Sequence, residues 1–391
     1  MTRRRAAASL TVLALLLPLP LAAAGAAVAA APPAAGAPAA PSARTVPELP
    51  RPTGRFAVGQ DTLHLVDRSR TDHWSGSGPR ELMVTMRYPA QRGTGGPVRY
   101  LTEEEARLLL ADRGLEQAVP ARTLAGTQAH ARSGARPVAG RYPLIVLSPG
   151  FTVPRATLTS LAEDLASRGY VVAAVDHAYE TSGTAFPGGR VLECLACEKA
   201  GGDRGYRAVS DGRAQDVSFL LDRLTGRDPA WIRAGLIDPR RIAMAGHSIG
   251  GASAAAAMAA DGRVRAGVDM DGTLATPVPA GGLGGRPFML LGAEGNGPGG
   301  QQSWDRDWPL LDGWKRWITF TGSGHFTFTD FPLIGDQLGI PDAETPLGGA
   351  RSLELTRRYV GAFFDQHLKG RPQPVLDGPS ADAPEVLFHR P

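Results

Sequence analysis

Residues 241–258 read RIAMAGHSIGGASAAAAM, an apolar strand followed by a glycine-rich turn and a helix of small residues. The turn places Ser248 between Gly246 and Gly250. Such a turn strains the backbone of the central serine and brings strand and helix so close that side chains at 246 and 250 would collide. The stretch therefore predicts that the Ser248 hydroxyl is presented at the carboxyl edge of a sheet, as a nucleophile.

The surrounding sequence predicts that sheet. From Leu82 onward, short apolar runs alternate with longer helical patterns, which is typical of strands joined by crossover helices in a mostly parallel sheet. Runs such as LIVL at 144–147 lack polar alternation, as expected for strands covered on both faces. The expected strands are 82–88, 144–147, 170–175, 241–245, 264–270, 287–291 and 317–320.

Helices are expected between these strands. Apolar residues spaced for one helical face predict helices over 157–168, 217–224 and 352–368. Another helix is expected to start at Thr102, where Thr-Glu-Glu-Glu offers a capping box. It belongs to an insertion, 97–137, which the sequence leaves open as a surface excursion or as a rim over the site.

Two backbone N–H groups are the expected partners of an anion formed beside Ser248. The N–H of Ile249 opens the helix, where donors are unpaired and the helix dipole favours negative charge. A second N–H is expected at Phe151, in the loop SPGF at 148–151, because Gly150 lets the backbone approach. We predict that Phe151 and Ile249 form an oxyanion hole.

A serine hydroxyl is a weak nucleophile and needs a base that is itself oriented by an acid. His325, in the loop GSGH at 322–325 beyond the last expected strand, is the predicted base. His367 and His389 fall in the C-terminal helix and in the tail, so they are disfavoured.

The acid is assigned by its place after a strand. Asp271 ends the strand 264–270 and is the predicted acid. Asp269, two residues earlier on the same face, and Glu294, after the next strand, remain alternatives.

The chain resembles the plasma-type (isoform II) platelet-activating factor acetylhydrolase family. The resemblance is densest in LSPGF (147–151), DLASRGYVVAAVDH (164–177), GHSIGG (246–251), GHF (324–326) and DF (330–331). It implies an α/β-hydrolase fold, cleavage of carboxylic esters and no cofactor or metal. In that family the acid lies in a Leu-Asp-Ala-Trp-like turn, which matches Asp271 in MDGT at 270–273.

Two departures from the family pattern limit what the resemblance implies. Pro149 stands where the family usually has histidine, and this change leaves the Phe151 N–H in place because proline removes only its own donor. Gly272 and Thr273 replace Ala-Trp after the acid, so the family's acyl preference does not carry over.

A second resemblance, to bacterial cutinases and polyester hydrolases, rests on the shared Gly-His-Ser-x-Gly-Gly turn. Their acid belongs to a Gly-Ala-Glu-x-Asp segment, and this chain reads GAEGN at 292–296. An amide at Asn296 does not stabilise an imidazolium as a carboxylate does, so a cutinase-type triad is disfavoured.

These residues together predict a serine esterase that acts through an acyl-enzyme on short-acyl or phospholipid-like esters. The glycine-rich loop 180–205 is either its specificity rim or a plain surface loop. A cutinase-like or triglyceride-lipase-like hydrolase, an acyltransferase that uses an alcohol, and a non-catalytic binding protein of the same fold remain alternatives.

The N-terminus predicts export. Three arginines at 3–5, an apolar run at 10–17 and VAA at 28–30 have the pattern of a signal peptide, assigned to 1–30. The run is shorter than the roughly 20 residues that cross a bilayer. The Ala/Pro-rich segment 31–52 is expected to be a disordered linker, and 53–391 a single catalytic domain of a secreted protein.

Charge and cysteine content exclude several other functions. The net charge is +4, and no Lys/Arg-rich run interleaved with aromatics is present, so nucleic acid is not an expected partner. The expected partners are a small-molecule or lipid ester and, transiently, a lipid surface. Cys194 and Cys197 favour a small loop-closing disulfide over a redox centre, and two cysteines exclude a four-cysteine zinc site.

Overall fold

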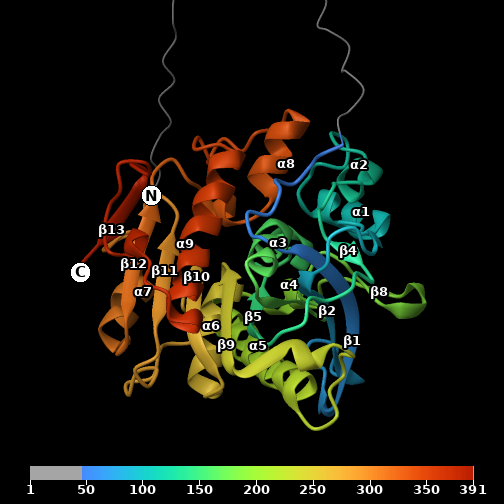
Figure 1. Ribbon diagram of the computed structural model, residues 1–391, viewed down its shortest axis with the longest axis horizontal. Coiled ribbons are helices and arrows are strands. Elements are labelled where there is room, and N and C mark those ends of the chain that lie inside the picture. The colour runs from blue at the N-terminus through green and yellow to red at the C-terminus, as the bar shows by residue number, and fades with distance from the viewer. Residues whose placement is uncertain (1–45, 391) are drawn as a thin grey trace, which may run out of the picture. The chain divides into compact units, whose positions relative to one another are not determined.

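An eleven-stranded sheet runs through residues 46–390, the part of the chain that this computed structural model describes (Figure 1). The six central strands, from β12 to β6, run parallel, and the flanking strands β13 and β2 pair with them antiparallel. The strand order is β13 (Val386–His389), β12 (Lys315–Phe320), β11 (Phe288–Gly292), β10 (Val264–Met270), β9 (Ile237–His247), β5 (Tyr142–Ser148), β6 (Val171–His177), β2 (Pro79–Ala90), β1 (Ala57–Thr71), β4 (Arg132–Ser133) and β3 (Gly96–Pro97).

Alternate side chains of the central strands pack into two separate hydrophobic cores, one on each face of the sheet. In β5, Leu144 and Val146 pack with α5 (Gly202–Thr225) and α6 (Ile249–Ala260). Ile145 and Leu147 pack on the other face with α3 (Thr159–Ser167) and α9 (Gly349–Lys369), which crosses in front of the strands in Figure 1. The predicted fold, a mostly parallel sheet of the α/β-hydrolase type with helices on both faces, is confirmed.

The expected elements are present with shifted ends. All seven predicted strands occur, as β2, β5, β6 and β9 to β12. The segment 157–168 is a 3₁₀ turn (Arg155–Leu158) followed by α3, 217–224 is the last part of α5, and 352–368 lies within α9. Helix α1 (Glu103–Asp112) begins after Thr102, which forms the predicted capping box with Glu105.

Six strands were not predicted: β1, β13 and the two-residue strands β3, β4, β7 (Thr184–Ala185) and β8 (Val191–Leu192). Strand β1 carries charged and glycine residues and is half exposed, so it lacks the apolar run that revealed the central strands. The four-residue strand β13 lies in the expected tail, where His389 accepts or donates a hydrogen bond at Thr319 Oγ1 (2.8 Å).

The expected linker, 31–52, is too long at its C-terminal end. Leu49 is 1% exposed, and its N–H donates to the carbonyl of Gln128 (2.9 Å). Burial of the Leu49 side chain stabilises this segment against the folded domain, although its Ala/Pro-rich composition predicted disorder. The predicted signal peptide, 1–30, and residues 31–45 lie outside the described residues.

The insertion 97–137 packs as a small cluster beside the carboxyl edge of the sheet. Its helices α1 and α2 (Ala121–Ala125) share apolar contacts with α8 (Phe331–Leu338) and with Val153, just past the loop 148–151. None of the helices in residues 46–390 combines the length and apolarity needed to cross a bilayer.

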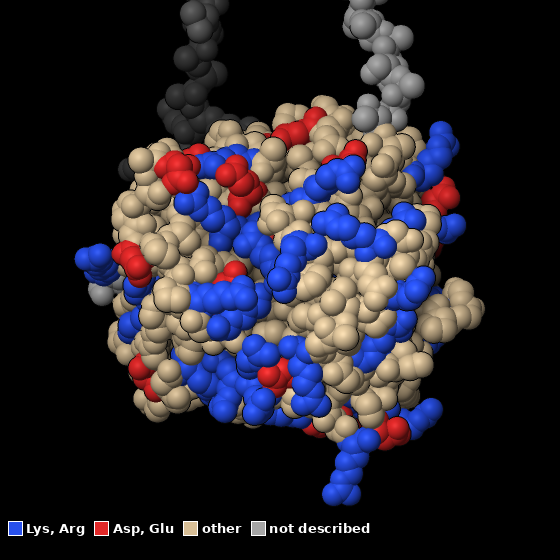
Figure 2. Space-filling view, viewed as in Figure 1, with Lys and Arg blue, Asp and Glu red and all other residues tan. Residues whose placement is uncertain are grey.

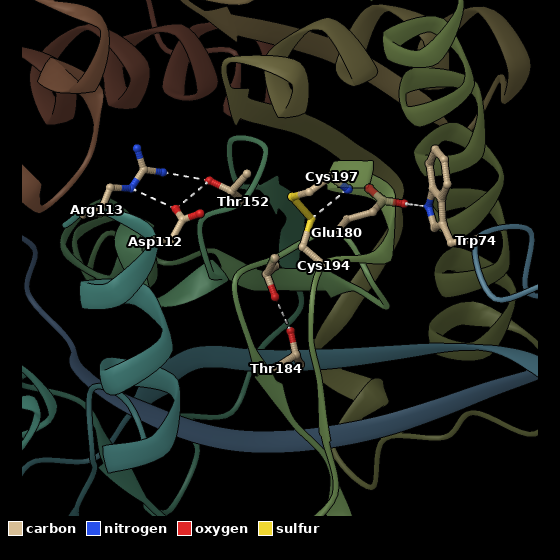
Figure 3. Close-up of a disulfide and its surroundings, with 9 residues drawn as sticks. Trp74, Asp112, Arg113, Thr152, Glu180, Thr184, Cys194 and Cys197 are labelled. Carbon is tan, nitrogen blue, oxygen red and sulfur yellow. Dashed lines mark hydrogen bonds and ion pairs between the residues drawn. A yellow bond between two sulfur atoms is a disulfide. The ribbon is translucent and has the colours of Figure 1, made fainter. Parts of the chain in front are cut away.

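The expected loop 180–205 contains regular structure. It includes the pair β7 (Thr184–Ala185) and β8 (Val191–Leu192), helix α4 (Leu195–Lys199) and the first turn of α5. Cys194 and Cys197 form the predicted disulfide at the start of α4 (Figure 3). The composition indicated a loop because seven residues of this range are glycines or prolines. None of the seven lies within 190–200, where the disulfide and the hydrogen bond from the Ala196 N–H to the Tyr179 carbonyl (3.0 Å) hold the chain.

Candidate active site

The turn between β9 and α6 has the strained geometry that its sequence predicts. Ser248 adopts φ 55° and ψ −128°, and its N–H donates to the Met270 carbonyl (2.8 Å). A Cβ at Gly246 would lie 2.2 Å from the carbonyl carbon of Gly250, and a Cβ at Gly250 would lie 2.1 Å from the carbonyl oxygen of Ser148. Both glycines are therefore required, and the surrounding packing holds the serine in its unfavourable conformation.

Ser248 borders a cavity of about 890 Å³ at the carboxyl edge of the sheet. This volume falls in the range of small-molecule sites. The cavity wall brings together all five residues singled out from the sequence, which are Phe151, Ser248, Ile249, Asp271 and His325.

His325 and Asp271 are directly paired. His325 starts a 3₁₀ turn (His325–Phe328) after β12, and its Nδ1 lies 2.6 Å from Asp271 Oδ2. Because Nδ1 is engaged, Nε2 is the nitrogen left for a group in the cavity. Among the described residues no hydrogen bond joins Ser248 to His325, and such bonds often tighten only when substrate binds.

Asp271 follows β10 and is held in place by three donors. Its backbone has φ 62°, and its Oδ1 accepts from the Ala293 N–H and from Asn296 Nδ2, both at 2.7 Å. Burial alone would raise the pKa of this carboxyl, but the hydrogen bond from His325 and the two at Oδ1 outweigh burial and hold the pKa below its ordinary value. Asp271 is therefore ionised beside the imidazole.

The two alternative acids are engaged elsewhere. Asp269 is completely buried and accepts from the Gly272 N–H (2.9 Å) and from the Trp304 indole (3.1 Å). Burial, aided by repulsion from Asp271, raises its pKa well above the ordinary value. Glu294 Oε2 accepts from the Gly322 N–H (2.6 Å), and within residues 46–390 no hydrogen bond or ion pair joins Glu294 to His325.

The two expected oxyanion donors face the same cavity. In residues 46–390 neither the Phe151 N–H nor the Ile249 N–H donates to another protein atom. A Cβ at Gly150 would lie 2.8 Å from His247 Nδ1, so only glycine lets the loop approach the turn this closely.

His247 is a site residue that sequence reasoning did not single out. It is buried, its ring lies 4.6 Å from the His325 ring, and its Nε2 is 2.7 Å from the His325 carbonyl oxygen. A carbonyl only accepts, so Nε2 carries the proton. Burial, aided by the proximity of His325, lowers the pKa of His247 to about 3, so the ring is neutral. The signal was its place directly before Ser248.

A buried ionic network under the loop 148–151 was also missed. Arg213, from α5, donates to the Pro149 carbonyl (2.5 Å) and to Ser148 Oγ (3.1 Å), while its Nε donates to Glu180 (2.7 Å). Arg80, from β2, donates to Glu180 (2.8 Å) and to other carboxylates of the network. These charges come from separate strands and helices, so no local sequence pattern announces them.

The insertion contributes a cation to the cavity wall. Arg113, at the end of α1, donates to Thr152 Oγ1 (2.8 Å) and lies 3.3 Å from Asp112, as Figure 3 shows. Its guanidinium lies over the Phe326 ring, 4.9 Å from the centroid. The insertion thus forms part of the rim.

The loop 180–205, left open as a rim or a plain surface loop, contributes little to the cavity wall. Asp203 is its only residue in the cavity wall, and Tyr206, which packs edge-on against Phe151 (6.1 Å between centroids), follows directly. Both lie on helix α5, whose first turn replaces the expected loop.

Within residues 46–390 no group of three or more His, Cys, Asp or Glu side chains is placed to hold a metal ion. The groups that line the cavity suit acid–base and nucleophilic chemistry, with one hydroxyl, one imidazole paired to a carboxylate, and two backbone donors.

Comparisons with known proteins agree with this chemistry. A family model described as platelet-activating factor acetylhydrolase, isoform II, matches residues 47–186. A probable 1-alkyl-2-acetylglycerophosphocholine esterase of Arthroderma benhamiae is 30% identical over 377 residues, which cover 87% of this chain and 93% of the relative. The platelet-activating factor acetylhydrolase of Bos taurus is 27% identical over 281 residues, which cover 63% of this chain and 60% of the relative.

A solved structure is also similar. The ferulic acid esterase from Streptomyces cinnamoneus superposes with a TM-score of 0.79 at 45% sequence identity, over 88% of this chain and 100% of that chain.

Proposed function

Because the chain belongs to the isoform II platelet-activating factor acetylhydrolase family, and is a carboxylic ester hydrolase, we propose that Ser248, His325 and Asp271 form its catalytic triad. One observation carries the proposal. A serine in a strained strand-to-helix turn and a histidine paired to a buried, ionised aspartate line the same cavity.

The proposed reaction proceeds in two halves. His325 Nε2 takes the proton of Ser248 as the serine oxygen bonds to the ester carbonyl carbon, and the carbonyl electron pair moves onto oxygen. Collapse of this intermediate expels the alcohol, which takes the proton from His325. Water then repeats the sequence on the acyl-enzyme, releasing the acid and restoring the serine.

The other proposed site residues stabilise the charges that form during the reaction and orient the imidazole. The N–H groups of Phe151 and Ile249 are proposed to stabilise the oxyanion, since neither has a hydrogen-bond partner within residues 46–390. Asp271 stays ionised, orients the ring and stabilises the imidazolium that forms after proton transfer. No step requires a cofactor. We propose that the protein is exported, on the sequence pattern of residues 1–30.

Short-acyl or phospholipid-like esters are the first proposed substrates, in line with the acetylhydrolase relatives. A second candidate is an ester of a phenolic acid. It is favoured by the aromatic wall that Phe151, Tyr206 and Phe326 give the cavity, and by the similar solved ferulic acid esterase. An aromatic acyl group gains most from edge and face contacts with such rings.

The triad is tested by labelling and substitution. A fluorophosphonate should label the protein at Ser248, as located by peptide mass, and Ser248→Ala should abolish both the label and p-nitrophenyl acetate hydrolysis. Asp271→Asn should lower kcat by about 10³-fold or more, because the imidazole then lacks its anionic partner. Glu294→Gln is the matched control and should keep nearly full activity. Full activity of Asp271→Asn with loss in Glu294→Gln would overturn the assignment of the acid.

The substrate class is tested by comparing kcat/KM for p-nitrophenyl acetate, an acetylated ether phospholipid, methyl ferulate, tributyrin and a long-chain triglyceride emulsion. A preference for the first two supports the acetylhydrolase proposal, and a preference for methyl ferulate supports the phenolic-acid candidate. Preference for triglycerides would favour the lipase-like alternative. Addition of an alcohol, with analysis for a new ester product, tests acyl transfer.

A further inference from the structure

A second hollow, of about 600 Å³, lies at the opposite edge of the sheet from Ser248. Its wall includes Tyr142 at the start of β5, Gly169 just before β6 and Lys369 at the end of α9. These positions mark the amino edge of the parallel strands, whereas Ser248 follows the carboxyl end of β9. We call this site the basic hollow, after its six cationic residues Arg55, Arg141, Arg168, Arg241, Lys369 and Arg371.

Three of these cations are already neutralised by carboxylates. Arg168 pairs with Asp164 (2.7 Å) and Arg241 with Asp238 (2.7 Å). Lys369 pairs with Asp365 (2.9 Å), the one acidic residue in the wall.

The other three cations have no such partner. Arg55, Arg141 and Arg371 are exposed, and none forms an ion pair with a carboxylate in residues 46–390. They come from three distant parts of the chain, yet they line one concave site. The hollow therefore carries an excess of about three positive charges that the described protein does not balance.

The crowding of like charge also acts on Lys369. Burial is the main cause that lowers the pKa of this amine, and the nearby cations Arg371 and Arg168 lower it further, against the opposing effect of Asp365. Figure 2 shows the same excess at larger scale, with Lys and Arg outnumbering acidic residues over the central and lower part of the face that α9 crosses. An anion bound in the hollow would relieve this repulsion.

The wall indicates what kind of anion fits. Guanidinium groups with free donors match carboxylate or sulfate groups in a two-pronged geometry. Phe56 and Tyr142 stand edge to face in the same wall, with centroids 6.1 Å apart, and offer apolar surface to a sugar ring. Among the described residues, the exposed large apolar side chains are Val46, Tyr206, Ile232 and Leu387, and none of them borders the hollow, so it lacks groups that insert into a bilayer.

We propose that the basic hollow binds an acidic polysaccharide, whose carboxylates pair with Arg55, Arg141 and Arg371 while a sugar ring packs on Phe56 or Tyr142. Binding there leaves the catalytic cavity, at the other edge of the sheet, open to solvent. The protein can thus be held on a polymer while it acts on esters nearby. The proposal does not depend on the identity of the catalytic triad.

Binding of the full-length protein to polygalacturonate tests the proposal. The wild type should bind at low ionic strength, and its affinity should fall as added salt screens the charges. The triple variant Arg55→Gln, Arg141→Gln, Arg371→Gln should bind roughly tenfold more weakly, as expected for the loss of three exposed charge contacts. Its p-nitrophenyl acetate hydrolysis should be unchanged, because the hollow is remote from Ser248.

The matched control removes the same charge elsewhere, through Arg68→Gln, Arg99→Gln and Arg227→Gln, which are exposed and lie outside the hollow. Its affinity for polygalacturonate should stay within about twofold of the wild type if the contact is local. Equal losses in both triple variants would overturn the proposal in favour of unspecific charge attraction. The proposal is also overturned if the wild type does not bind polygalacturonate. The same holds if the wild type binds anionic phospholipid vesicles or duplex DNA with equal affinity in the same buffer.

Discussion

Arg213 donates a hydrogen bond from inside the protein to the carbonyl oxygen of Pro149, 2.5 Å away. Pro149 lies two residues before Phe151, whose N–H is a proposed oxyanion donor. The same guanidinium also binds Glu180, and the Thr152 N–H donates to the Glu180 carbonyl (3.0 Å). The Arg213 side chain thus fixes the loop 148–151 at Pro149, and the backbone hydrogen bond of Thr152 fixes it just after Phe151.

Arg213→Lys is therefore expected to lower kcat about tenfold with little change in KM. Lysine keeps the charge opposite Glu180 but lacks the fork that reaches Glu180 and Pro149 together, so the Phe151 N–H loses its fixed direction. Steady-state kinetics and thermal unfolding should be measured on the same samples.

Arg80→Lys is the matched control for Arg213→Lys. Arg80 is buried in the same network but donates to the Ala178 carbonyl and not to the loop 148–151. Its substitution should lower the melting temperature with a smaller effect on kcat. Equal kcat losses in the two variants would show that Arg213 serves stability alone.

Asn296 is expected to act through Asp271, because its amide donates to Asp271 Oδ1 (2.7 Å). Asn296→Leu removes one of three donors and should lower kcat a few-fold. Asn296→Asp places a second carboxylate beside Asp271, and the added negative charge favours the protonated form of the neighbouring imidazole, which is the proposed base. The acid limb of the kcat/KM profile should then move to higher pH, and the pH profiles of both variants check this. An unmoved limb in Asn296→Asp would contradict the positioning role.

His247 is expected to hold the His325 loop as a neutral donor. Its pKa of about 3 means that it stays uncharged above about pH 4, so the effect of its substitution should not vary with pH. His247→Phe keeps a ring between Gly150 and Phe326 but loses the bond to the His325 carbonyl, and kcat should fall about tenfold. His247→Gln, which can still donate, should lose less. A larger loss in His247→Gln than in His247→Phe would argue for ring packing instead.

The turn between β9 and α6 could be predicted from the sequence because its constraints are local. Gly246, Gly250 and Ser248 are set by one turn, and the strand and helix around them have plain apolar patterns. The pairing of His325 with Asp271 followed from the order of strands, since carboxyl ends of parallel strands meet at one edge. These features depend on few residues, each close to a recognisable element.

The basic hollow and the Arg213 network were not readable, because each is assembled from distant segments. Arg55, Arg141 and Arg371 lie far apart in the sequence and outside any long run of basic residues, so no local pattern indicates that they line one site. Leu49 was assigned to a linker for a similar reason, since its burial depends on contacts with the insertion and not on its neighbours. Tertiary proximity, not local propensity, decides all of these cases.

Asp330 is expected to make stability fall as pH rises. Its buried carboxyl accepts from Tyr100 (3.2 Å) and from the Ser160 N–H (3.2 Å). Burial raises its pKa to about 8, against the lowering effects of the Ser160 bond and of Arg357. The unfolded carboxyl has a pKa of about 3.9, so between about pH 4 and 8 the folded state holds a proton that the unfolded chain has lost.

The contribution of Asp330 to the free energy of unfolding should consequently decrease through this interval by on the order of 1 kcal/mol per pH unit at most. Asp330→Asn has a similar shape and cannot ionise, so its stability relative to the wild type should grow between about pH 5 and pH 8. Urea unfolding at both pH values measures the difference, with the exposed Asp377→Asn as the control that should leave the slope unchanged. If Asp330→Asn kept the wild-type slope, a different buried group would have to hold the proton, and Asp269, whose pKa burial also raises, would be the next to substitute.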